Sequence, residues 1–388
     1  MVQLRLSHFM TSGRTPNATV LLIVVLVGAI LMSACGPSGG TTPIPIESKA
    51  VAAVTTAPAT ATPPAPTPTP TPTPKPKFWP LNGLPAAPDA SLTRRPLNVR
   101  LPNDPNARPQ YGLNKADLVF EMIVEGGVTR FSAIFQSKDA DTVGPIRSYR
   151  WSDLQLTQML RGALVSSGST VQETDAVTRS IKDGNMLSVD AVRDGRPYYR
   201  LASRPAPNNL FTGTLADREA VNRAGGAGPV TVPALSFLPP GSDPATGGLA
   251  GSVPATKIGV PFQGVWASSF SWDTSAKGYR RSQGGSQTVD GDGSGPILAK
   301  NVIVMTTDIW ESSVIEDSLG SKGLDYRFTG GGPVSVFRDG LRIDGTWKRD
   351  GVLDMFTFFD PAGKEILLEP GQTWIHFIYA SWNVTSSP

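Results

Sequence analysis

Hydrophobic and polar residues alternate on both sides of a glycine pair in the segment LVFEMIVEGGVTRFSAIF (118–135). This alternation predicts two β-strands, because successive side chains of a strand point to opposite faces of a sheet. A two-residue turn at 126–127 would join them into a hairpin. With that register, Glu121, Glu125 and Arg130 share the face turned away from the core. The core face carries Phe120, Met122, Val124, Thr129, Phe131, Ala133 and Phe135.

The hairpin pattern therefore predicts a carboxylate–guanidinium–carboxylate cluster on one face. Two interpretations of this cluster remain open. It forms surface ion pairs that add little stability, or it directs charged groups at a ligand.

Shorter patterns predict further elements. Apolar runs predict strands at 97–100, 163–166, 301–306, 334–337, 341–347, 356–359, 366–368 and 374–379. Helical patterns predict one helix from a capping Ser148 to about Gly162 and a second over 173–183. Strands with few helices and no regular β–α–β alternation predict an α+β fold. We expect a layered sheet/helix first domain of the β-β-α sandwich type, followed by a β-rich region.

Two stretches rich in proline and glycine divide the chain. The first ends in TPPAPTPTPTPTPKPK and lacks the large apolar residues that a core needs, which predicts a disordered, extended stalk. The second separates the mixed region from the strand-rich region. The predicted division is a signal peptide at 1–35, a stalk at 36–77, an N-terminal domain at 78–228, a connection at 229–255 and a C-terminal domain at 256–388.

The N-terminal segment has the features of an export signal. Arg5 and Arg14 precede the apolar run TVLLIVVLVGAILM (19–32), and small residues then lead to Cys35. The run is short for a membrane span, which needs about 20 residues. The arrangement resembles bacterial lipoprotein signals, in which the cysteine is lipidated; the alternative is an uncleaved anchor with an unrelated cysteine. Both interpretations place the folded part outside the cytoplasmic membrane, and lipid on Cys35 would hold it to the outer face.

Composition excludes several kinds of chemistry. Cys35 is the single cysteine, so the folded part has no disulfide, thiolate metal site or cysteine nucleophile. His376 is the single histidine beyond the signal, which leaves too few ligands for zinc and one candidate base for a Ser-His-Asp triad. The net charge of +3 gives no argument for nucleic acid. We expect no metal, no cofactor and no nucleic-acid partner.

One acidic stretch, DGDGSG (290–295), resembles the start of a calcium loop. The twelfth position of that loop is Asn301, which lacks the bidentate carboxylate that calcium loops require. We therefore expect a polar turn here.

Arginines near the hairpin suggest an anion site. Arg147 and Arg150 flank Ser148 at the expected start of a helix, where free N–H groups and the helix dipole favour anions. Arg108 and Arg130 lie in the same region, and guanidinium groups suit carboxylate or phosphate. The alternative is that these arginines fix loops by binding backbone carbonyls and the nearby glutamates.

Two motifs, NDPNARPQYGLNKADLVFEMIVEGGVTRFSAIFQS (103–137) and GPIRSYR (144–150), resemble the YerB-like family of bacterial lipoproteins, a family of unknown function. Four later stretches resemble its C-terminal region: YRRSQGG, AKNVIVM, VFRDGLRIDGTWKR and EPGQTW. The resemblance spans nearly all of 78–388. It implies a lipid-anchored extracytoplasmic protein with a layered α+β fold, without an established activity. The family pattern falls on Arg108, Gln110, Glu121, Glu125, Thr129, Arg130, Arg147, Ser148, Arg150 and Asn209.

The chain departs from the family pattern at two places. Members tend to carry a histidine in the segment that matches 206–210, where this chain has Asn208. They tend to carry another near 287–290, where this chain has none. These departures favour binding over catalysis.

Three functions follow as hypotheses. The first is a non-catalytic envelope protein that binds a wall component or an envelope protein through the residues of the family pattern, with no catalytic residue. The second is a hydrolase of wall glycan or peptide that uses Glu121 and Glu125 as an acid/base pair. The third is a structural spacer module.

Overall fold

The computed structural model describes residues 76–388. The predicted signal peptide, its Cys35 and the predicted stalk as far as residue 75 lie outside the described residues.

The described part of the chain contains both helices and many strands. Its α-helices are α1 (Trp151–Met159), α2 (Val171–Lys182) and α3 (Thr214–Arg223). Its strands up to β14 are β1 (Lys77–Phe78), β2 (Pro85–Ala86), β3 (Leu97–Pro102), β4 (Leu118–Ile123), β5 (Thr129–Phe135), β6 (Ala163–Ser166), β7 (Leu187–Asp190), β8 (Tyr199–Arg200), β9 (Leu210–Phe211), β10 (Val253–Pro254), β11 (Lys257–Val260), β12 (Ser268–Asp273), β13 (Gly278–Gln283) and β14 (Ser286–Gln287).

The later strands complete the set. They are β15 (Val289–Asp290), β16 (Gly295–Pro296), β17 (Leu298–Ala299), β18 (Asn301–Thr306), β19 (Ile309–Ile315), β20 (Lys322–Tyr326), β21 (Gly330–Arg338), β22 (Leu341–Arg349), β23 (Thr357–Phe359), β24 (Thr373–Ile378) and β25 (Thr385–Ser387). These elements confirm the predicted α+β class with a β-rich C-terminal region.

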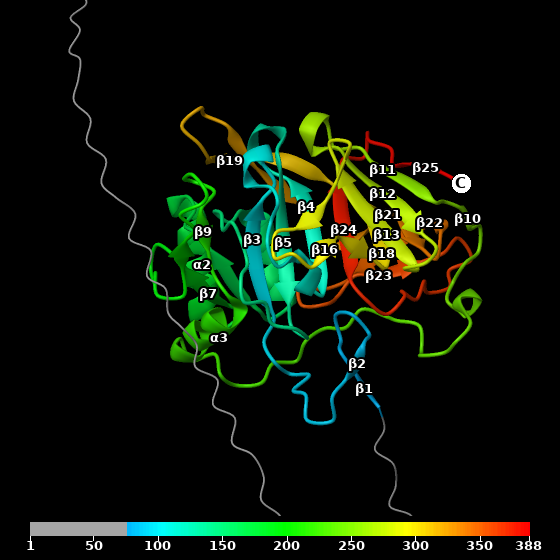
Figure 1. Ribbon diagram of the computed structural model, residues 1–388, viewed down its shortest axis with the longest axis horizontal. Helices are drawn as coiled ribbons and strands as arrows, with labels where there is room; N and C mark the ends of the chain where they lie inside the picture. The colour runs from blue at the N-terminus through cyan, green and yellow to red at the C-terminus, as the bar shows by residue number, and fades with distance from the viewer. Residues whose placement is uncertain (1–75) are drawn as a thin grey trace, which may run out of the picture. The chain divides into compact units, whose positions relative to one another are not determined.

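One 11-stranded sheet runs through both halves of the described chain, in the order β10-β22-β21-β18-β24-β4-β5-β3-β6-β7, with β23 paired to β22. Strand β24, close to the C-terminus, lies parallel to β18 on one side and to β4 on the other. Figure 1 shows β24 in red at the middle of the molecule, beside β4. The last long strand of the chain therefore joins the two halves into one sheet. The domain boundaries at 228 and 256 stay a prediction.

One face of this central sheet is covered mainly by a second sheet. The second sheet has the order β14-β13-β12-β11-β25, with β17 paired to β13. Its Phe270 and Tyr279 share a core with Phe131 and Trp374 of the central sheet. Helix α3 joins the same core through Val221. The apolar side chains on this face are almost completely removed from water.

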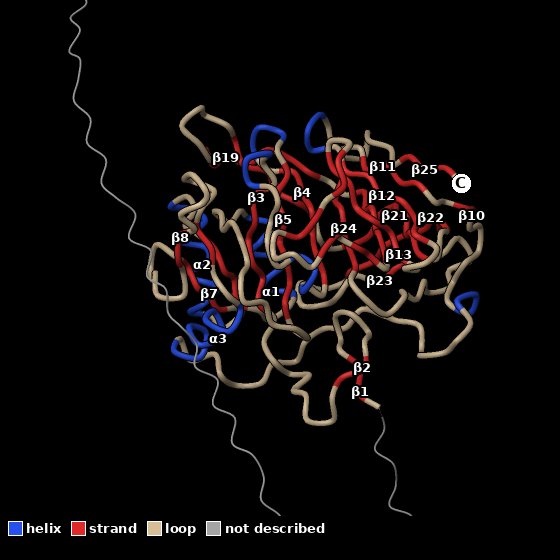
Figure 2. The backbone as a smooth tube through the Cα atoms, in the orientation of Figure 1, coloured by secondary structure: helices blue, strands red, loops and turns tan. Residues whose placement is uncertain are grey.

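The opposite face is covered by helices and by loops of the C-terminal half. Leu156 of α1 packs in a core with Phe120 and Phe377. Val177 of α2 packs with Leu164 of β6. Figure 2 shows the α-helices toward the end of the sheet that holds β7, while strands fill the other end. Because both faces are covered, any charged side chain on the middle strands must find its partners inside the protein.

Local signals explain several of the observed elements. Thr170 caps α2, because its side chain accepts a hydrogen bond from the Glu173 N–H. The predicted hairpin at 334–347 is confirmed as β21–β22. Its turn residues Asp339 and Gly340 have φ of 55° and 73°, which matches the turn that Asp-Gly favours.

Some predicted boundaries are wrong. The first helix begins after an N-cap at Arg150, two residues later than Ser148. There the Arg150 N–H donates to Asp153 Oδ2 at 2.8 Å, which satisfies a free backbone donor at the start of the helix. The run at 366–368 is not a strand and contributes one isolated bridge, between Leu368 and Phe237. Within residues 76–388, none of the helices has the length and apolar character needed to cross a membrane.

Candidate functional site

The hairpin with the glycine pair forms as predicted, but its register differs. The loop between β4 and β5 contains a single 3-10 turn, Glu125–Gly127, and the Val124 N–H donates to the Val128 carbonyl at 2.8 Å. This loop is longer than a two-residue turn. The strands consequently pair Glu121 with Phe131 and Met122 with Arg130.

The observed register separates the predicted cluster. Because directly paired residues share a face, Glu121 and Arg130 lie on opposite faces of the central sheet. Both faces are covered, so the expectation of a solvent-exposed charged face is wrong. Glu121 is 0% exposed and Glu125 is 7% exposed. Two separate charged clusters result, one on each side of the hairpin.

The first, the Glu121 cluster, comprises Glu121, Asn103, Thr129, Ser268, Arg281 and His376. Oxygen Oε1 of Glu121 accepts hydrogen bonds from Asn103 Nδ2 (3.1 Å) and Thr129 Oγ1 (3.0 Å). Oxygen Oε2 accepts from Ser268 Oγ and Arg281 Nη2, each at 3.0 Å. His376 Nδ1 lies 3.4 Å from Oε2. Donors therefore surround both oxygens of this carboxylate.

Arg281 is as buried as the carboxylate that it binds. Its guanidinium lies 4.8 Å from the Trp374 ring centre and 5.1 Å from the Phe131 ring centre. Burial by itself raises the pKa of Glu121, but the Arg281 charge, the close approach of His376 and the Arg281 hydrogen bond outweigh it and lower the pKa to about 2. Burial lowers the pKa of His376, although Glu121 opposes this shift. The cluster is a fully buried ionic connection between β4, β13 and β24.

The second, the Glu125 cluster, comprises Glu125, Arg130, Arg147, Ser148 and Arg150. Arg130 Nη2 donates to Glu125 Oε1 at 2.6 Å, and Arg150 Nε donates to Glu125 Oε2 at 2.8 Å. Arg150 Nη2 also donates to Glu125 Oε1. Arg130 Nη1 donates to the Ser148 carbonyl at 2.9 Å. The motif residues 125, 130, 148 and 150 thus meet at one place.

Backbone hydrogen bonds position this cluster at the carboxyl ends of two parallel strands. The Arg147 N–H donates to the Arg100 carbonyl in β3, and the Ser167 N–H, just after β6, donates to the Arg147 carbonyl. Ser148 Oγ donates to the Ser167 carbonyl at 3.1 Å. Helices α1 and α2 begin directly after these segments, at Arg150 and at Thr170. Ligands of open sheets commonly bind at this edge, where strands end and helices begin.

The guanidinium groups of the Glu125 cluster differ in how closely they are paired. Arg130 and Arg150 both bind the Glu125 carboxylate, and Arg150 also lies 3.1 Å from Glu316 Oε2. Arg147 has one ion-pair contact, with Asp104 at 3.9 Å. Arg100 on β3 is already paired with Asp153, at 3.1 Å. Burial, with repulsion from the neighbouring arginines, lowers the pKa of Arg130 to about 9. Arg147 is therefore the least tightly paired arginine of the cluster.

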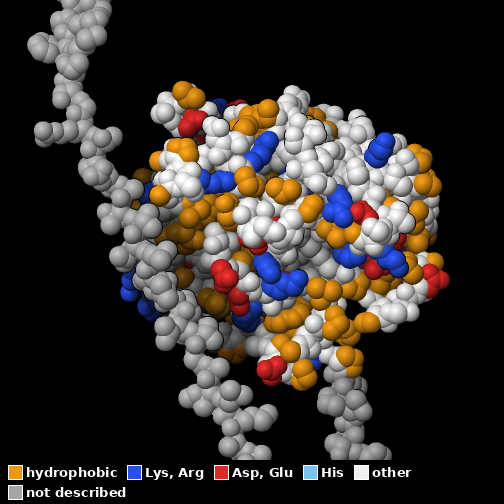
Figure 3. All heavy atoms as spheres, in the orientation of Figure 1, with side chains coloured by type: hydrophobic (Ala, Val, Ile, Leu, Met, Phe, Trp, Pro, Cys, Tyr) orange, Lys and Arg blue, Asp and Glu red, His pale blue; other side chains and the backbone are white. Residues whose placement is uncertain are grey.

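Surface charge and side-chain exposure complete the description of these arginines. On the face drawn in Figure 3, basic and acidic side chains are interspersed and form no continuous field of one sign. Side-chain exposure within the cluster falls from 29% for Arg147 to 13% for Arg130 and 6% for Arg150. Arg147 is thus the guanidinium most open to an external group.

Two other predicted residues lie outside the Glu125 cluster. Arg108 donates to the Asn103 and Val265 carbonyls and lines a cavity of about 390 Å³ together with Gln110. Asn209 accepts a hydrogen bond from Arg200 across the β8–β9 hairpin. Arg108 is thus held by two backbone carbonyls and Asn209 by Arg200, apart from both charged clusters.

Sequence reasoning missed the partners that come from distant parts of the chain. Arg281 binds Glu121 from β13, and Glu316, from the turn after β19, lies 3.1 Å from Arg150. The stretch YRRSQGG contained Arg281, but no local pattern marked it as buried. The acidic stretch at 290–295 forms the polar turn that we expected: Asp290 accepts the Gly112 and Asn114 N–H groups.

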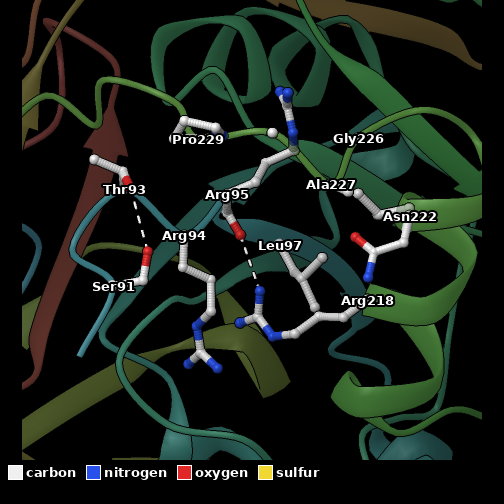
Figure 4. A pocket seen from close by; sticks show the side chains of 12 residues that line it. Ser91, Thr93, Arg94, Arg95, Leu97, Arg218, Asn222, Gly226, Ala227 and Pro229 are labelled. Carbon is white, nitrogen blue, oxygen red and sulfur yellow. Dashed lines mark hydrogen bonds between the residues drawn. The ribbon is translucent and has the colours of Figure 1, made fainter. Parts of the chain in front are cut away.

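A third group of arginines surrounds a cavity of about 270 Å³ near α3. Figure 4 shows that the Arg94 and Arg95 side chains extend in opposite directions there, while Arg218 turns to the Arg95 carbonyl. Arg94 and Arg218 both pair with Asp139, at 2.8 and 2.9 Å. Arg94 and Arg218 therefore form ion pairs within the protein, and these guanidinium groups do not converge on the cavity. In the part of the chain that the structure describes, no group of acidic or histidine side chains is arranged to hold a metal.

Comparison with known proteins identifies the family. Residues 81–226 match the N-terminal domain, and residues 258–375 the C-terminal domain, of the family described as "Protein of unknown function (DUF3048)". The chain belongs to this family. It is 29% identical over 300 residues to the Bacillus subtilis (strain 168) protein named "Putative lipoprotein YerB", an alignment covering 77% of this chain and 85% of that protein.

A solved structure supports the same relationship. The crystal structure of YerB from Bacillus subtilis matches with a TM-score of 0.67 at 26% identity, covering 80% of this chain and all of that one. The YerB-like resemblance of the sequence motifs is thereby confirmed. The Glu125 cluster lies within the N-terminal family domain, whereas Glu316 and Arg281 belong to the C-terminal one.

Proposed function

We propose that this family member is a lipid-anchored, extracytoplasmic binding protein that holds an anionic component of the cell wall at the Glu125 cluster. The observation that carries the proposal is that Arg130 and Arg150 meet at the Glu125 carboxylate beside the starts of two helices, while the neighbouring Arg147 is only loosely paired. Loosely paired guanidinium groups near helix N-termini favour carboxylate or phosphate groups. Partly buried guanidinium groups bind anions more strongly than fully solvated ones.

The proposed location rests on the N-terminal sequence and on the relative. The apolar run before Cys35 resembles a lipoprotein signal, and the name of the Bacillus subtilis relative describes a lipoprotein. A proline-rich stalk after Cys35 would extend about 3 Å per residue and hold the binding region away from the bilayer. This reach favours a ligand in the wall over one at the membrane surface.

Hydrolysis by Glu121 and Glu125 has less support. Glu121 is fully buried and its pKa is lowered to about 2, whereas a general acid needs a raised pKa and access to substrate. Glu125 is bonded to two arginines, and Glu121 to a third. The two carboxylates therefore do not flank a shared substrate position as the acid/base hypothesis requires.

Arg147 provides the test of the binding proposal. Arg147→Ala removes the most exposed guanidinium of the cluster, and its one ion-pair contact is 3.9 Å long, so the fold should persist. A lost charge-assisted hydrogen bond should weaken binding by about tenfold or more. The measurement is calorimetric titration of the full chain, purified from membranes in detergent, with peptidoglycan fragments.

The matched control is Arg196→Ala. Arg196 is 69% exposed and pairs with Asp194 away from the cluster, so its loss should leave affinity unchanged. No binding by the wild type, or equal weakening by both variants, would contradict the proposal. Recovery of the full chain from the soluble fraction of cells would contradict the lipid anchor.

A further inference from the structure

The tip of the β19–β20 hairpin places a glutamate of the chain itself against the Glu125 cluster. Glu316 follows β19, and its Oε2 lies 3.1 Å from Arg150 Nε. The Glu316 side chain is 0% exposed. Arg150 thus contacts two carboxylates, Glu125 from the β4–β5 loop and Glu316 from a hairpin far along the chain.

Glu316 also lies beside a second buried acid, Glu173, in the first turn of α2. Glu173 is 1% exposed, and its Oε2 accepts hydrogen bonds from Ser169 and Thr170. Its Oε1 and both Glu316 oxygens lack a well-formed hydrogen bond. Burial, with repulsion from Glu173 and Glu125, raises the pKa of Glu316 to about 8 despite Arg150. Burial also raises the pKa of Glu173, so the two carboxyls hold a proton near neutral pH.

Little else ties the hairpin tip to the rest of the protein. Its backbone bonds are internal, from Glu316 to Ser321 and from Leu319 and Ser321 to Asp317. Leu319 is 89% exposed and Ile315 is 50% exposed. The base of the hairpin is held firmly, because the Tyr326 hydroxyl donates to the Ile123 carbonyl at 2.6 Å. The tip is therefore the part of the hairpin that can move.

We propose that Glu316 occupies the place of a ligand carboxylate, and that the ligand of the Glu125 cluster enters by displacing the hairpin tip. This inference rests on the proposed function and deepens it, because it names the ligand class. A carboxylate of the ligand takes the position of the Glu316 carboxylate at Arg150, beside Glu173 and the start of α2. Displacement brings Glu316 into water, where a carboxylate is well solvated.

The neighbouring acids favour a carboxylate over a phosphate. A ligand carboxylate can share a proton with Glu173, because carboxyl groups of similar pKa form such pairs. A phosphate carries up to two charges at neutral pH and would face Glu125 and Glu173 at close range. The ligand therefore resembles the Glu316 side chain: it is a peptide or a sugar acid with a free carboxylate.

Binding of defined probes tests this inference. The probes are a short peptide with a free C-terminal carboxylate, the same peptide with a C-terminal amide, and inorganic phosphate. Glu316→Gln removes the competing carboxyl group at nearly constant size, so the full chain should bind the carboxylate peptide about tenfold more tightly than the wild type does. The amide and phosphate should bind weakly to both. The control is Glu311→Gln on the same hairpin, whose side chain is 66% exposed and pairs with Lys322.

Hydrogen exchange provides a readout that needs no ligand. Backbone amides of 315–321 should exchange faster in Glu316→Gln than in the wild type or in Glu311→Gln. Unchanged exchange, or equal affinity of Glu316→Gln and wild type for the carboxylate peptide, would overturn the inference. If Glu316→Gln has no effect but Arg147→Ala still weakens binding of wall fragments, this inference is wrong and the proposed function stands. Stronger binding of phosphate than of the carboxylate peptide would overturn the ligand class alone.

Discussion

At the scale of single residues, Glu121 and Glu125 show what a sequence can indicate about charged groups. The hairpin pattern predicts Arg130 as the partner of both glutamates. The structure confirms that pair for Glu125, whereas Glu121 pairs with Arg281. Arg281 binds Glu121 from 160 positions away, and Arg150 binds Glu125 from 25 positions away. Only the fold brings such distant groups together. Local spacing in the hairpin can indicate Arg130 alone as a partner of the two glutamates.

The environment of Glu121 leads to a prediction about stability. Glu121→Gln removes a fully buried charge and leaves Arg281 buried without its counter-charge. Breaking a buried ion pair in this way should lower the free energy of unfolding by about 3 kcal/mol at pH 7. Urea unfolding of the folded region measures the change. The control is Asp350→Asn, which breaks an exposed pair with Lys348 and should cost less than about 1 kcal/mol.

The pH dependence of this effect follows from the lowered pKa of Glu121. Because the pKa is about 2 in the folded protein and near 4.5 in the unfolded chain, the ionised carboxylate stabilises the fold fully above pH 4.5. That contribution declines as the pH falls from 4.5 toward 2. The difference in unfolding free energy between wild type and Glu121→Gln should therefore be smaller at pH 3 than at pH 7. An equal difference at pH 3 and at pH 7 would show that the interaction lost in Glu121→Gln is not ionic.

At the scale of elements, two hairpins differ in how well their turns could be predicted. Asp339 and Gly340 specify a two-residue turn between β21 and β22, and the structure has it. The pair Gly126 and Gly127 suits several turns, since glycine adopts positive φ at little cost. The observed loop uses a 3-10 turn, with φ of 68° and 73° at these glycines. One extra loop position changed the face of Arg130 relative to Glu121.

The glycine pair supports a second prediction. An added Cβ at Gly126 or Gly127 would meet no atom within 4 Å, so a substitution tests the backbone conformation alone. Gly126→Ala should cost about 1–2 kcal/mol in unfolding free energy, because L-residues resist this left-handed region. Gly126→Asn should cost less, since asparagine tolerates it. Gly228→Ala, also in open space but without a positive φ, should be nearly neutral. A neutral Gly126→Ala would be inconsistent with the observed turn.

At the scale of the whole folded region, local patterns predicted the class but not the connection between the halves. The mixture of strands and helices indicated α+β, and the proline- and glycine-rich stretch at 229–255 suggested two domains. Parallel pairing joins segments far apart in the chain, so no local pattern reveals it. Strand β24 pairs with β4 across more than two hundred positions, as the register of Thr373 with Leu118 shows. The same connection brings Glu316 and Arg281 to the N-terminal clusters.

The position of β24 predicts that the N-terminal half does not fold alone. A chain of residues 76–228 would lack β24, leaving the apolar strand β4 as an open edge and Glu121 without Arg281 and His376. We expect this fragment to aggregate or to unfold without a sharp transition, whereas 76–388 unfolds cooperatively. Co-expression of 76–228 with 229–388 should restore a soluble complex, because the cut lies outside the strands of the central sheet. Near-ultraviolet circular dichroism and urea unfolding of each sample measure the difference. A sharp transition in 76–228 alone would contradict this prediction. It would show that the N-terminal half is stable without β24 and without the partners that the C-terminal half supplies to the charged clusters.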